Sequence, residues 1–363
     1  MTQKSNSVTI REVARQAKVS VATVSRYINR SAPVSNGVAK RLEKVMTNLQ
    51  YSPHAAARHL ASRKTHVVGL LLTNMHNVFF GPMVSGVESA VRENGYNLIV
   101  ATYLPNVHKD GNLPPIGPHN TDGLIVFANS LQVHQLKQLY EKHFPVVLVH
   151  RTPPDSLPIP YVTVENKAAT RRLIDHLIEA HGRSRIMFLR GPAYQEDSRW
   201  RELGYQASLA AHNLPYDPHL ILNGGFERDI AYIAMQEFLS GPHPDFDAIF
   251  AGDDDAAYGS LLALQGAGLR VPEDISLVGF DDQKLSAFLT PQLTTVRAPT
   301  EAVGRVAGEH LFALLRGATV NRATLLPTDI ILRRSCGCAA GINSPSGGDH
   351  REYIHVAITP SEN

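Results

Sequence analysis

Residues 19 to 29 read Val19-Ser20-Val21-Ala22-Thr23-Val24-Ser25-Arg26-Tyr27-Ile28-Asn29. Ser20 is a helix-capping residue type, and Val24 and Ile28 lie one helical turn apart, so they can be buried together on one face. The opposite face then exposes small apolar tips, short hydroxyls and the guanidinium of Arg26. This set suits a DNA groove, because hydroxyls can bond phosphates and an arginine fork can bond a guanine edge bidentately.

Two further helices are predicted around this segment. Thr9 with Glu12 three residues later forms a capping box, and an apolar stripe follows at residues 13–17. Lys18 to Ser20 then makes a tight turn. Ser35 can cap a third helix, whose apolar residues recur at helical spacing at Val38, Leu42, Val45 and Leu49. The three helices together predict a helix-turn-helix domain.

The alternative interpretation is a small helical bundle with an incidental polar face, and the distribution of charge distinguishes the two. Residues 1–65 carry 12 Lys and Arg against two acidic residues, whereas the remaining residues carry 23 basic and 31 acidic ones. The formal net charge of +2 therefore hides a basic head on an acidic body. The basic head is the part that would meet DNA phosphates.

In these motifs the chain resembles the LacI/GalR family of bacterial transcription regulators, and the resemblance extends from Thr9 to about Arg334. The matching DNA-binding segments, in the family's order and spacing, are Thr9 to Ala14, Val19 to Asn29 and Tyr51 to Ala61. The resemblance implies that Val21, Ala22 and Arg26 occupy base-reading positions. Valine followed by alanine is most similar to the galactose-repressor branch, whose operators are pseudo-palindromes about a central CG step.

The run from Pro53 to Arg63 is expected to form a helix only when it packs against another surface. An isolated helix of about two turns is only marginally stable in water. Composition alone favours an alanine-rich linker. The resemblance instead implies the family's hinge helix, in which a leucine from each subunit, here Leu60, opens a base step in the minor groove. His54 departs from the family's asparagine. The expected DNA-binding residues are Thr9, Ser20, Val21, Ala22, Thr23, Ser25, Arg26, Asn29, Ala57 and Leu60.

Length and composition predict a globular protein of more than one domain, since the chain has 363 residues, 43% of them hydrophobic and 19% charged. No apolar run could span a bilayer and no signal-peptide core is present, so a cytoplasmic protein without membrane contact is expected. The expected parts are a helix-turn-helix domain at 1–52, a hinge helix or linker at 53–65, a two-lobed effector-binding and dimerisation domain at 66–335, and a flexible tail at 336–363.

From His66 onward, short apolar runs alternate with amphipathic stretches, which predicts an α/β domain with parallel sheets. The expected strands are 67–72, 97–101, 123–127, 146–149, 186–189, 248–251 and 276–280. A helix at 301–316 and a final strand at 325–332 follow. Residues 104–120 contain four prolines where the family has a helix, so a loop is predicted there. The resemblance implies two lobes like those of a periplasmic sugar-binding protein.

Polar and aromatic residues follow the predicted strands, at the carboxyl ends where parallel sheets bind ligands. Carboxylates can bond vicinal hydroxyls and aromatic rings offer apolar faces, so a sugar-like ligand is favoured. Aspartates at 253–255 and 281–282 could instead bind Mg²⁺ or serve a hydrolase, but no nucleophile elbow or phosphate loop is near. The resemblance implies effector roles for several of these residues. The expected effector-binding set is Asn77, Phe79, Phe80, His150, Arg151, Arg201, Phe226, Asp253 and Asp281.

Three positions depart from the family's usual cleft. His150 replaces an aspartate, Ala298 replaces a polar residue and Val78 replaces a proline. The effector is therefore expected to be a carbohydrate other than the usual hexose, a sugar phosphate or acidic sugar that His150 and Arg151 would attract, or a ligand of another class.

No cofactor or resident metal is expected. The chain has neither a dinucleotide fingerprint nor a P-loop, and its 17 histidines show no ligand spacing, which favours scattered surface positions. Cys336 and Cys338 make neither a disulfide framework nor a complete metal site. They are expected to be reduced thiols, with a redox or metal role as the alternative.

The predicted function is sequence-specific transcriptional regulation, in the form of a repressor that binds double-stranded operator DNA as a homodimer under effector control. One alternative is a periplasmic-type sugar-binding protein that does not bind DNA. The basic head and the missing export signal oppose it. The other is an enzyme on the same scaffold, which the missing catalytic constellation opposes.

Overall fold

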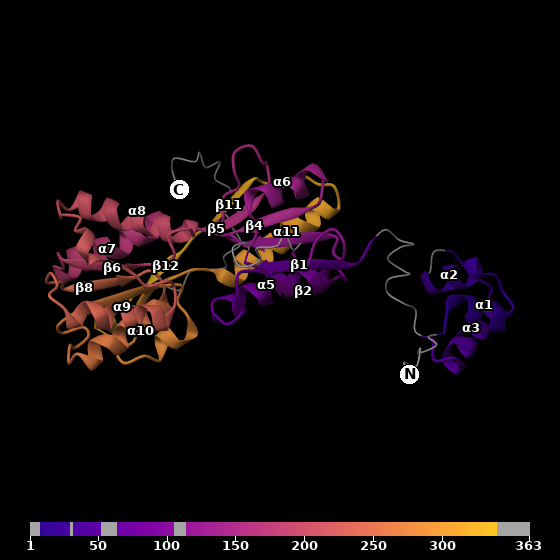
Figure 1. Ribbon diagram of the computed structural model, residues 1–363, viewed down its shortest axis with the longest axis horizontal. Coiled ribbons are helices and arrows are strands. Elements are labelled where there is room, and N and C mark those ends of the chain that lie inside the picture. Colours follow the sequence, from indigo (N-terminus) through magenta and orange to yellow (C-terminus); the bar gives the residue numbers. More distant parts are fainter. Residues whose placement is uncertain (1–7, 30–31, 52–63, 105–113, 340–363) are drawn as a thin grey trace, which may run out of the picture. The chain divides into compact units, whose positions relative to one another are not determined.

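The computed structural model describes residues 8–29, 32–51, 64–104 and 114–339. The chain divides between Thr65 and His66 into two compact units, a helical unit and a two-lobed unit (Figure 1).

The helical unit confirms the predicted helix-turn-helix. Its described helices are α1 (Ile10–Ala17), α2 (Val21–Asn29) and α3 (Asn36–Asn48). Lys18 makes the turn between α1 and α2 with a left-handed backbone, φ 54°. Ser20 Oγ accepts a hydrogen bond from the Thr23 amide at 3.1 Å, as its capping residue type predicts. The buried core of this unit consists of Val13, Ala14, Ala17, Val24 and Leu42.

The predicted side-chain caps of the other two helices are wrong. Neither Thr9 nor Ser35 makes a side-chain cap hydrogen bond. The Glu12 carboxylate lies 2.5 Å from the Arg15 guanidinium, one turn further along α1. Because that pairing directs Glu12 forward along the helix, it does not reach back to Thr9. The backbone carbonyl of Thr9 instead accepts the amide of Glu12 at 3.0 Å.

The two-lobed unit contains two six-stranded sheets, one at the centre of each lobe. In lobe 1 the strand order is β11 (Ala323–Leu326), β5 (Tyr161–Val164), β4 (Val146–Val149), β3 (Gly123–Phe127), β1 (Val67–Leu72) and β2 (Asn97–Thr102). In lobe 2 it is β12 (Asp329–Ile331), β10 (Thr294–Arg297), β9 (Ser276–Phe280), β8 (Ala248–Ala251), β6 (Ile186–Arg190) and β7 (Ile221–Asn223). Every described pair is parallel except β10 with β12.

Helices cover the faces of both sheets (Figure 1). Those of lobe 1 are α5 (Phe80–Glu93), α6 (Val133–Glu141) and α11 (Thr300–Leu315). Those of lobe 2 are α7 (Lys167–His181), α8 (Glu196–Ala211), α9 (Arg228–Ser240) and α10 (Asp254–Gly266). The chain crosses between the lobes three times, after β5, after β10 and after β11. Each lobe is therefore assembled from separate stretches of the chain.

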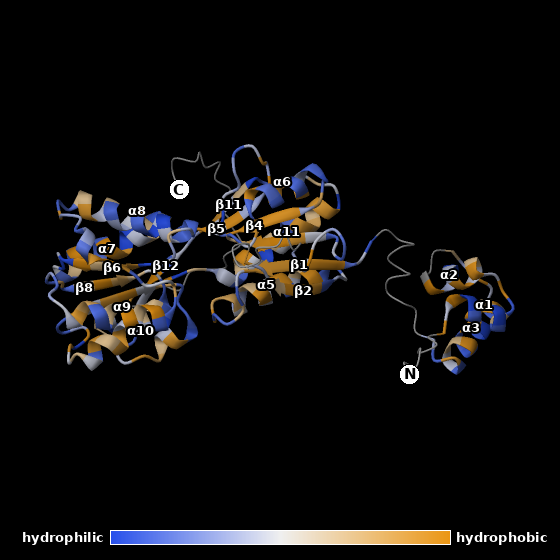
Figure 2. Cartoon of the chain, in the orientation of Figure 1, coloured by the Kyte–Doolittle hydropathy of each residue, from blue (hydrophilic) through white to orange (hydrophobic). Residues whose placement is uncertain are grey.

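The cores lie where the sheets meet their helices. Strands β3, β8 and β9 are buried along their whole length, and Figure 2 shows the strands as hydrophobic and the outer helices as mixed. Glycine allows α5 and α11 to touch backbone to backbone. A Cβ on Gly86 would lie 2.0 Å from the Glu301 carbonyl, and one on Gly304 would lie 2.2 Å from the Met83 carbonyl.

The seven strands predicted between residues 67 and 280 are confirmed, as is the helix predicted at 301–316. The single strand predicted at 325–332 is wrong, because β11 and β12 are separate strands in different lobes. Pro327 and Thr328 carry the chain across between them, and proline has no amide to donate to a sheet. Residues 115–120 of the predicted loop form bends and turns, residues 104 and 114 have no regular structure, and residues 105–113 lie outside the described residues.

Within the described ranges, no helix is both long enough and apolar enough to cross a membrane.

Candidate DNA-binding surface and effector cleft

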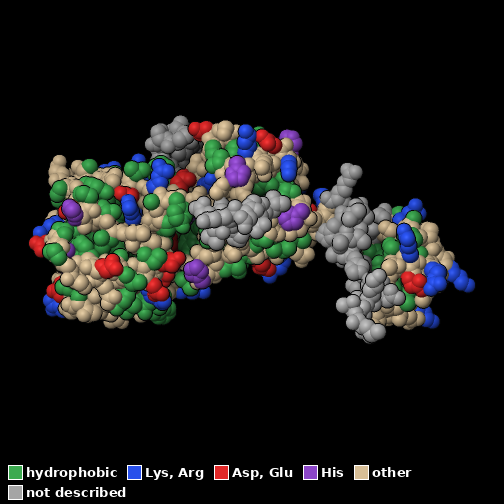
Figure 3. Space-filling model, viewed as in Figure 1, with side chains coloured by type: hydrophobic (Ala, Val, Ile, Leu, Met, Phe, Trp, Pro, Cys, Tyr) green, Lys and Arg blue, Asp and Glu red, His purple; other side chains and the backbone are tan. Residues whose placement is uncertain are grey.

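The predicted base-reading residues lie on the outer face of α2. Val21 is 42% exposed, and Ala22 and Arg26 are exposed too, as are Thr9 and Ser20 near the helix starts. Thr23 and Ser25 are half-buried. Figure 3 shows Lys and Arg side chains over the helical unit. The side chain of Asn29, and Ala57 and Leu60 with the whole predicted hinge helix, lie outside the described residues.

A cavity of about 220 Å³ opens between the two lobes, at the carboxyl ends of their strands. It brings together most of the predicted effector residues. Those that line it are Asn77, Phe79 and Phe80 from lobe 1 and Arg201, Phe226, Asp253 and Asp281 from lobe 2.

Arg201 on α8 is the fixed cation of this cleft, and only 3% of it is exposed. Its Nε donates to Asn166 Oδ1 at 2.9 Å and its Nη1 donates to the carbonyl of Gly252. Its Nη2 lies 3.4 Å from Asp281 Oδ1. The guanidinium carbon also stacks 3.6 Å from the centre of the Phe280 ring. These contacts hold the guanidinium in one orientation before any ligand arrives.

Asp253 and Asp281 are buried carboxyls beside Arg201. Burial raises the pKa of each to about 7, although the charge of Arg201 partly offsets this. Asp253 Oδ1 also caps α10 by accepting the Ala256 amide at 2.8 Å. Because the raised pKa favours the protonated form, these carboxyls can donate hydrogen bonds as well as accept them. A hydroxyl has the same two capacities.

Sequence reasoning missed Asp197, which also lines the cavity. It lies one helical turn before Arg201 on α8, a spacing that placed both on one face and could have identified it. Its Oδ2 lies 2.8 Å from His150 Nδ1 and its Oδ1 accepts from Asn166 at 2.9 Å. Burial alone would raise the pKa of Asp197, but His150 and Arg201 together lower it overall.

The structure does not bring His150 and Arg151 into the lining of the cavity. His150 is buried behind Asp197. Arg151 turns into lobe 1, where its Nη1 donates to the carbonyls of Ala128 at 3.2 Å and Leu131 at 2.5 Å. Arg151 therefore supports the backbone of lobe 1, and neither residue offers a free cation to an acidic ligand.

Phe226 supplies an apolar face on the lobe 2 side. Its ring rests on Gly191, where an added Cβ would lie 2.2 Å from the ring, and on Gly252. Across the cavity, Phe79 is half-buried, whereas Phe80 is 6% exposed and packs edge-on against Phe127 with ring centres 4.9 Å apart. Phe80 therefore belongs chiefly to the core of lobe 1, and Phe79 offers more of its surface to the cleft.

Hydrogen bonds cross the cleft and join the two lobes. Asn77 Nδ2 donates to the Phe226 carbonyl at 3.2 Å. Glu196 at the start of α8 accepts the Thr152 amide at 2.7 Å from the other lobe and, on its own lobe, the Trp200 indole at 3.1 Å. Trp200 is the chain's single tryptophan, so its fluorescence can report changes at this junction.

Asp254, next to the cleft, makes stability depend on pH. It is buried and accepts bonds from the Gln283 amide at 2.8 Å and from the hydroxyls of Ser286 and Thr295, and burial raises its pKa to about 8. The unfolded carboxyl, with a pKa of 3.8, releases its proton earlier than the folded one as the pH rises. Folding stability should therefore fall between about pH 4 and pH 8, by on the order of a few kcal/mol.

The Asp254→Asn variant should flatten this decline, because an amide keeps an acceptor for Gln283 and cannot ionise. Melting temperature measured against pH checks it. Asp255→Asn is the matched control, since that side chain is only half-buried. An Asp254→Asn protein with the wild-type slope would contradict the assignment.

Two family models match the chain. Residues 9–54 match "Bacterial regulatory proteins, lacI family", and residues 174–336 match "Periplasmic binding protein-like domain". The probable HTH-type transcriptional repressor ExuR of Bacillus subtilis (strain 168) is 30% identical, over 90% of this chain and 98% of its own. The ribose operon repressor of Escherichia coli (strain K12) is 32% identical with the same coverage.

Solved structures show the same architecture. The complex of the transcriptional regulator CelR with cellobiose is 30% identical, with a TM-score of 0.66 over 90% of this chain and 99% of that one. The Lac repressor dimer bound to operator and the anti-inducer ONPF has a TM-score of 0.75 at 24% identity, over 91% of this chain and 99% of that one. Its similarity supports the fold.

The curated relatives named above are transcriptional repressors and not enzymes. The chain thus belongs to the LacI family of bacterial regulatory proteins, and it is a DNA-binding transcriptional repressor controlled by a small-molecule effector.

Proposed function

We propose that this repressor binds a pseudo-palindromic operator as a homodimer and responds to a neutral, polyhydroxylated ligand about as large as one monosaccharide. The observation that carries the ligand assignment is the grouping of Arg201, Asp253 and Asp281 in one cavity with the rings of Phe79 and Phe226. Forked polar groups can bond neighbouring hydroxyls in pairs, while aromatic rings cover the apolar face of a sugar ring.

The charges favour a neutral ligand over the sugar phosphate or acidic sugar that the sequence left open. Three carboxyls, those of Asp197, Asp253 and Asp281, line the cavity together with the single guanidinium of Arg201. Arg151 points away from the cavity. A phosphate would therefore meet more carboxyls than guanidinium groups, and Asp197, whose pKa is lowered, stays charged and would repel it. The volume of about 220 Å³ suits a small ligand.

DNA recognition is assigned to the outer face of α2. Val21, Ala22 and Arg26 read bases in the major groove, and Leu60 of the predicted hinge helix at 53–65 acts in the minor groove. A pseudo-palindrome requires two-fold protein symmetry, so residues 66–335 would also carry the dimer contact. Because its operator belongs to the chromosome, the protein is expected to act in the cytoplasm.

The coupling between ligand and DNA is a shift between two arrangements of the lobes. A ligand that bonds Arg201 and Asp281 of lobe 2 and Phe79 of lobe 1 stabilises the arrangement in which those groups meet. Residues 53–65 lead directly into lobe 1, so its reorientation in a dimer alters whether two hinge segments can pair. Operator affinity then changes by the ligand's differential affinity for the two states.

The test is a titration of the full chain with a panel of neutral monosaccharides and their phosphates, followed by Trp200 fluorescence. We expect a saturable fluorescence change and a higher melting temperature with a neutral sugar, and little change with its phosphate. The same sugar should alter binding to an operator selected from random duplexes. Binding of phosphates in preference to every neutral sugar would contradict the proposed ligand class.

A further inference from the structure

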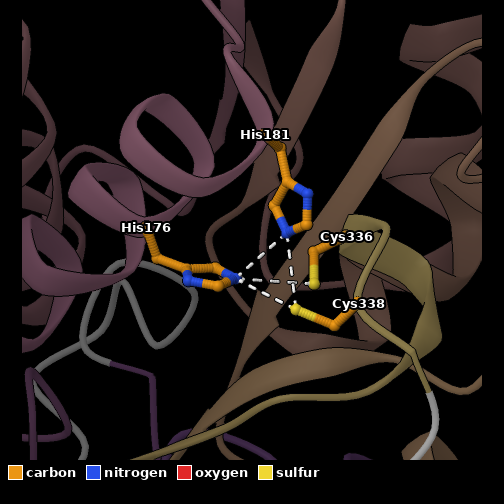
Figure 4. Close-up of side chains that lie close together, drawn as sticks. All are labelled: His176, His181, Cys336 and Cys338. Atoms are coloured by element: carbon orange, nitrogen blue, oxygen red, sulfur yellow. Dashed lines mark hydrogen bonds between the residues drawn. The ribbon is translucent and has the colours of Figure 1, made fainter.

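Four metal-ligating side chains meet in lobe 2, away from the effector cleft (Figure 4). His176 and His181 come from α7, Cys336 ends the short 3-10 helix η3 (Arg334–Cys336), and Cys338 follows it. We propose that these four residues bind one Zn²⁺ ion in a tetrahedral site. Neither the effector nor the operator needs this site, so it is independent of the proposed function.

Four of the six distances between the ligand atoms match a tetrahedron around zinc, and all six lie within 4.8 Å. The two imidazole Nε2 atoms lie 3.2 Å apart. Cys338 Sγ lies 3.4 Å from each of them, and Cys336 Sγ lies 3.7 Å from His176 Nε2. Zinc bonds of 2.0–2.1 Å to nitrogen and 2.3 Å to sulfur give tetrahedral edges of about 3.3 Å between nitrogens and about 3.5 Å between nitrogen and sulfur. The observed spacings agree with both within about 0.2 Å.

The chemical types of the four ligands favour zinc over other metal ions. Two thiolates balance the charge of a divalent ion, and two neutral imidazoles complete a set of soft and borderline donors that suits zinc. Calcium and magnesium require oxygen ligands, and among the described residues no carboxylate belongs to the cluster. Four protein ligands also leave no open position, which is typical of a structural zinc site.

Both ligand pairs are prepared by the local backbone. His176 and His181 have four residues between them, which lies within the histidine spacing of known zinc sites, so the expectation that no histidine pair has ligand spacing is wrong. The cysteines have only Gly337 between them, and its φ of +110° suits glycine. A Cβ at Gly337 would also lie 3.0 Å from His181 Nδ1.

Further hydrogen bonds orient the cysteine turn. Thr294 Oγ1 donates to Cys336 Sγ at 3.1 Å, and Ser276 Oγ donates to the Cys336 carbonyl at 2.8 Å. Cys336 is fully buried in lobe 2 and does not belong to a flexible tail that starts at residue 336. Such outer contacts fix the geometry of metal ligands and tune their affinity.

The site lies at the end of lobe 2 opposite the cleft. His181 and Ser276 stand near the amino ends of β6 and β9, whereas Asp253 and Asp281 follow the carboxyl ends of β8 and β9. A zinc ion here ties the segment after β12 to α7. Its role is to stabilise lobe 2, and its removal should leave effector binding to the folded protein unchanged.

The experiment uses the full chain without an affinity tag, purified under reducing conditions. We expect one zinc per chain by elemental analysis. After chelation, one Co²⁺ per chain should give the intense visible absorption of tetrahedral cobalt and a sulfur-to-cobalt charge-transfer band. Zinc should then displace both signals and raise the melting temperature. An absent metal in the isolated protein, together with weak octahedral-type cobalt absorption after reduction, would overturn the site.

Variants test the individual ligands. Cys338→Ser and His181→Asn should each lower zinc affinity at least about 100-fold, more than the loss of an outer-shell contact. His219→Asn, an exposed histidine of the same lobe, should not change it. Retained stoichiometric cobalt binding in Cys338→Ser would refute the assignment. So would a Cys336–Cys338 disulfide whose reduction restores no metal binding. The cobalt spectrum of the wild-type chain decides the question even if a variant fails to fold.

Discussion

Arg201→Ala abolishes the effector response of operator binding and lowers the stability of the two-lobed unit. The guanidinium is the one buried cation bonded to both Asn166 and Asp281 in the described cleft, so no neighbour replaces it for a ligand. Removing one partner of a buried ion pair costs about 3–5 kcal/mol. Protonation of Asp281, whose pKa is already about 7, will reduce that cost. Operator anisotropy with and without ligand, and denaturant unfolding, measure the two effects.

Arg201→Lys separates ligand binding from stability. Lysine keeps the charge beside Asp281 but loses the planar fork, so the fold should survive and the response should still be lost. Arg199→Ala, on the exposed side of the same helix, should behave as wild type. A full effector response in both Arg201 variants would remove this residue from the site.

Arg26→Ala removes sequence preference in DNA binding. A bidentate contact to guanine contributes about 1–3 kcal/mol of discrimination, so two copies in a dimer give a loss of roughly 30-fold to 25,000-fold in specific affinity. Binding to random duplex should fall much less, because Arg26 is one of 12 basic residues in positions 1–65. Competition between the selected operator and random DNA measures the ratio.

Lys44→Ala is the control for charge alone. Lys44 is exposed on α3, so its loss should weaken binding to every duplex equally and make the salt dependence slightly shallower. Equal losses for operator and random DNA in Arg26→Ala would place Arg26 on the phosphates and not on a base.

The sequence predicted the strands that are buried on both faces, such as residues 67–72 and 248–251, because their apolar runs are unbroken. It missed β5, β7 and β10. β5 reads Tyr-Val-Thr-Val, in which a threonine interrupts the apolar run. β7 has only three residues, and β10 reads Thr-Thr-Val-Arg, so neither gives a run of apolar residues. The crossing at Pro327 was hidden because only Pro327, Thr328 and Asp329 separate two apolar runs, residues 325–326 and 330–332.

The cleft residues that could be predicted were those that match a sequence motif of the family, such as Arg201 and Asp281. The orientation of Arg151 could not be predicted, because its partners are backbone carbonyls of Ala128 and Leu131, which carry no side-chain signal. The sequence also could not predict that the two cysteines and the two histidines form one cluster. Its two pairs lie more than 150 residues apart, and only the fold brings them together.

The three crossings between the lobes also determine the order in which the chain can fold during synthesis. Lobe 1 contains the first strand of its unit, yet it needs α11 and the edge strand β11 from near the other end of the chain. In the emerging polypeptide, the backbone amides and carbonyls along this edge of β5 therefore have no strand to pair with until residues 323–326 have left the ribosome. A chimera that exchanges one lobe with a relative must likewise join the two parents at three junctions.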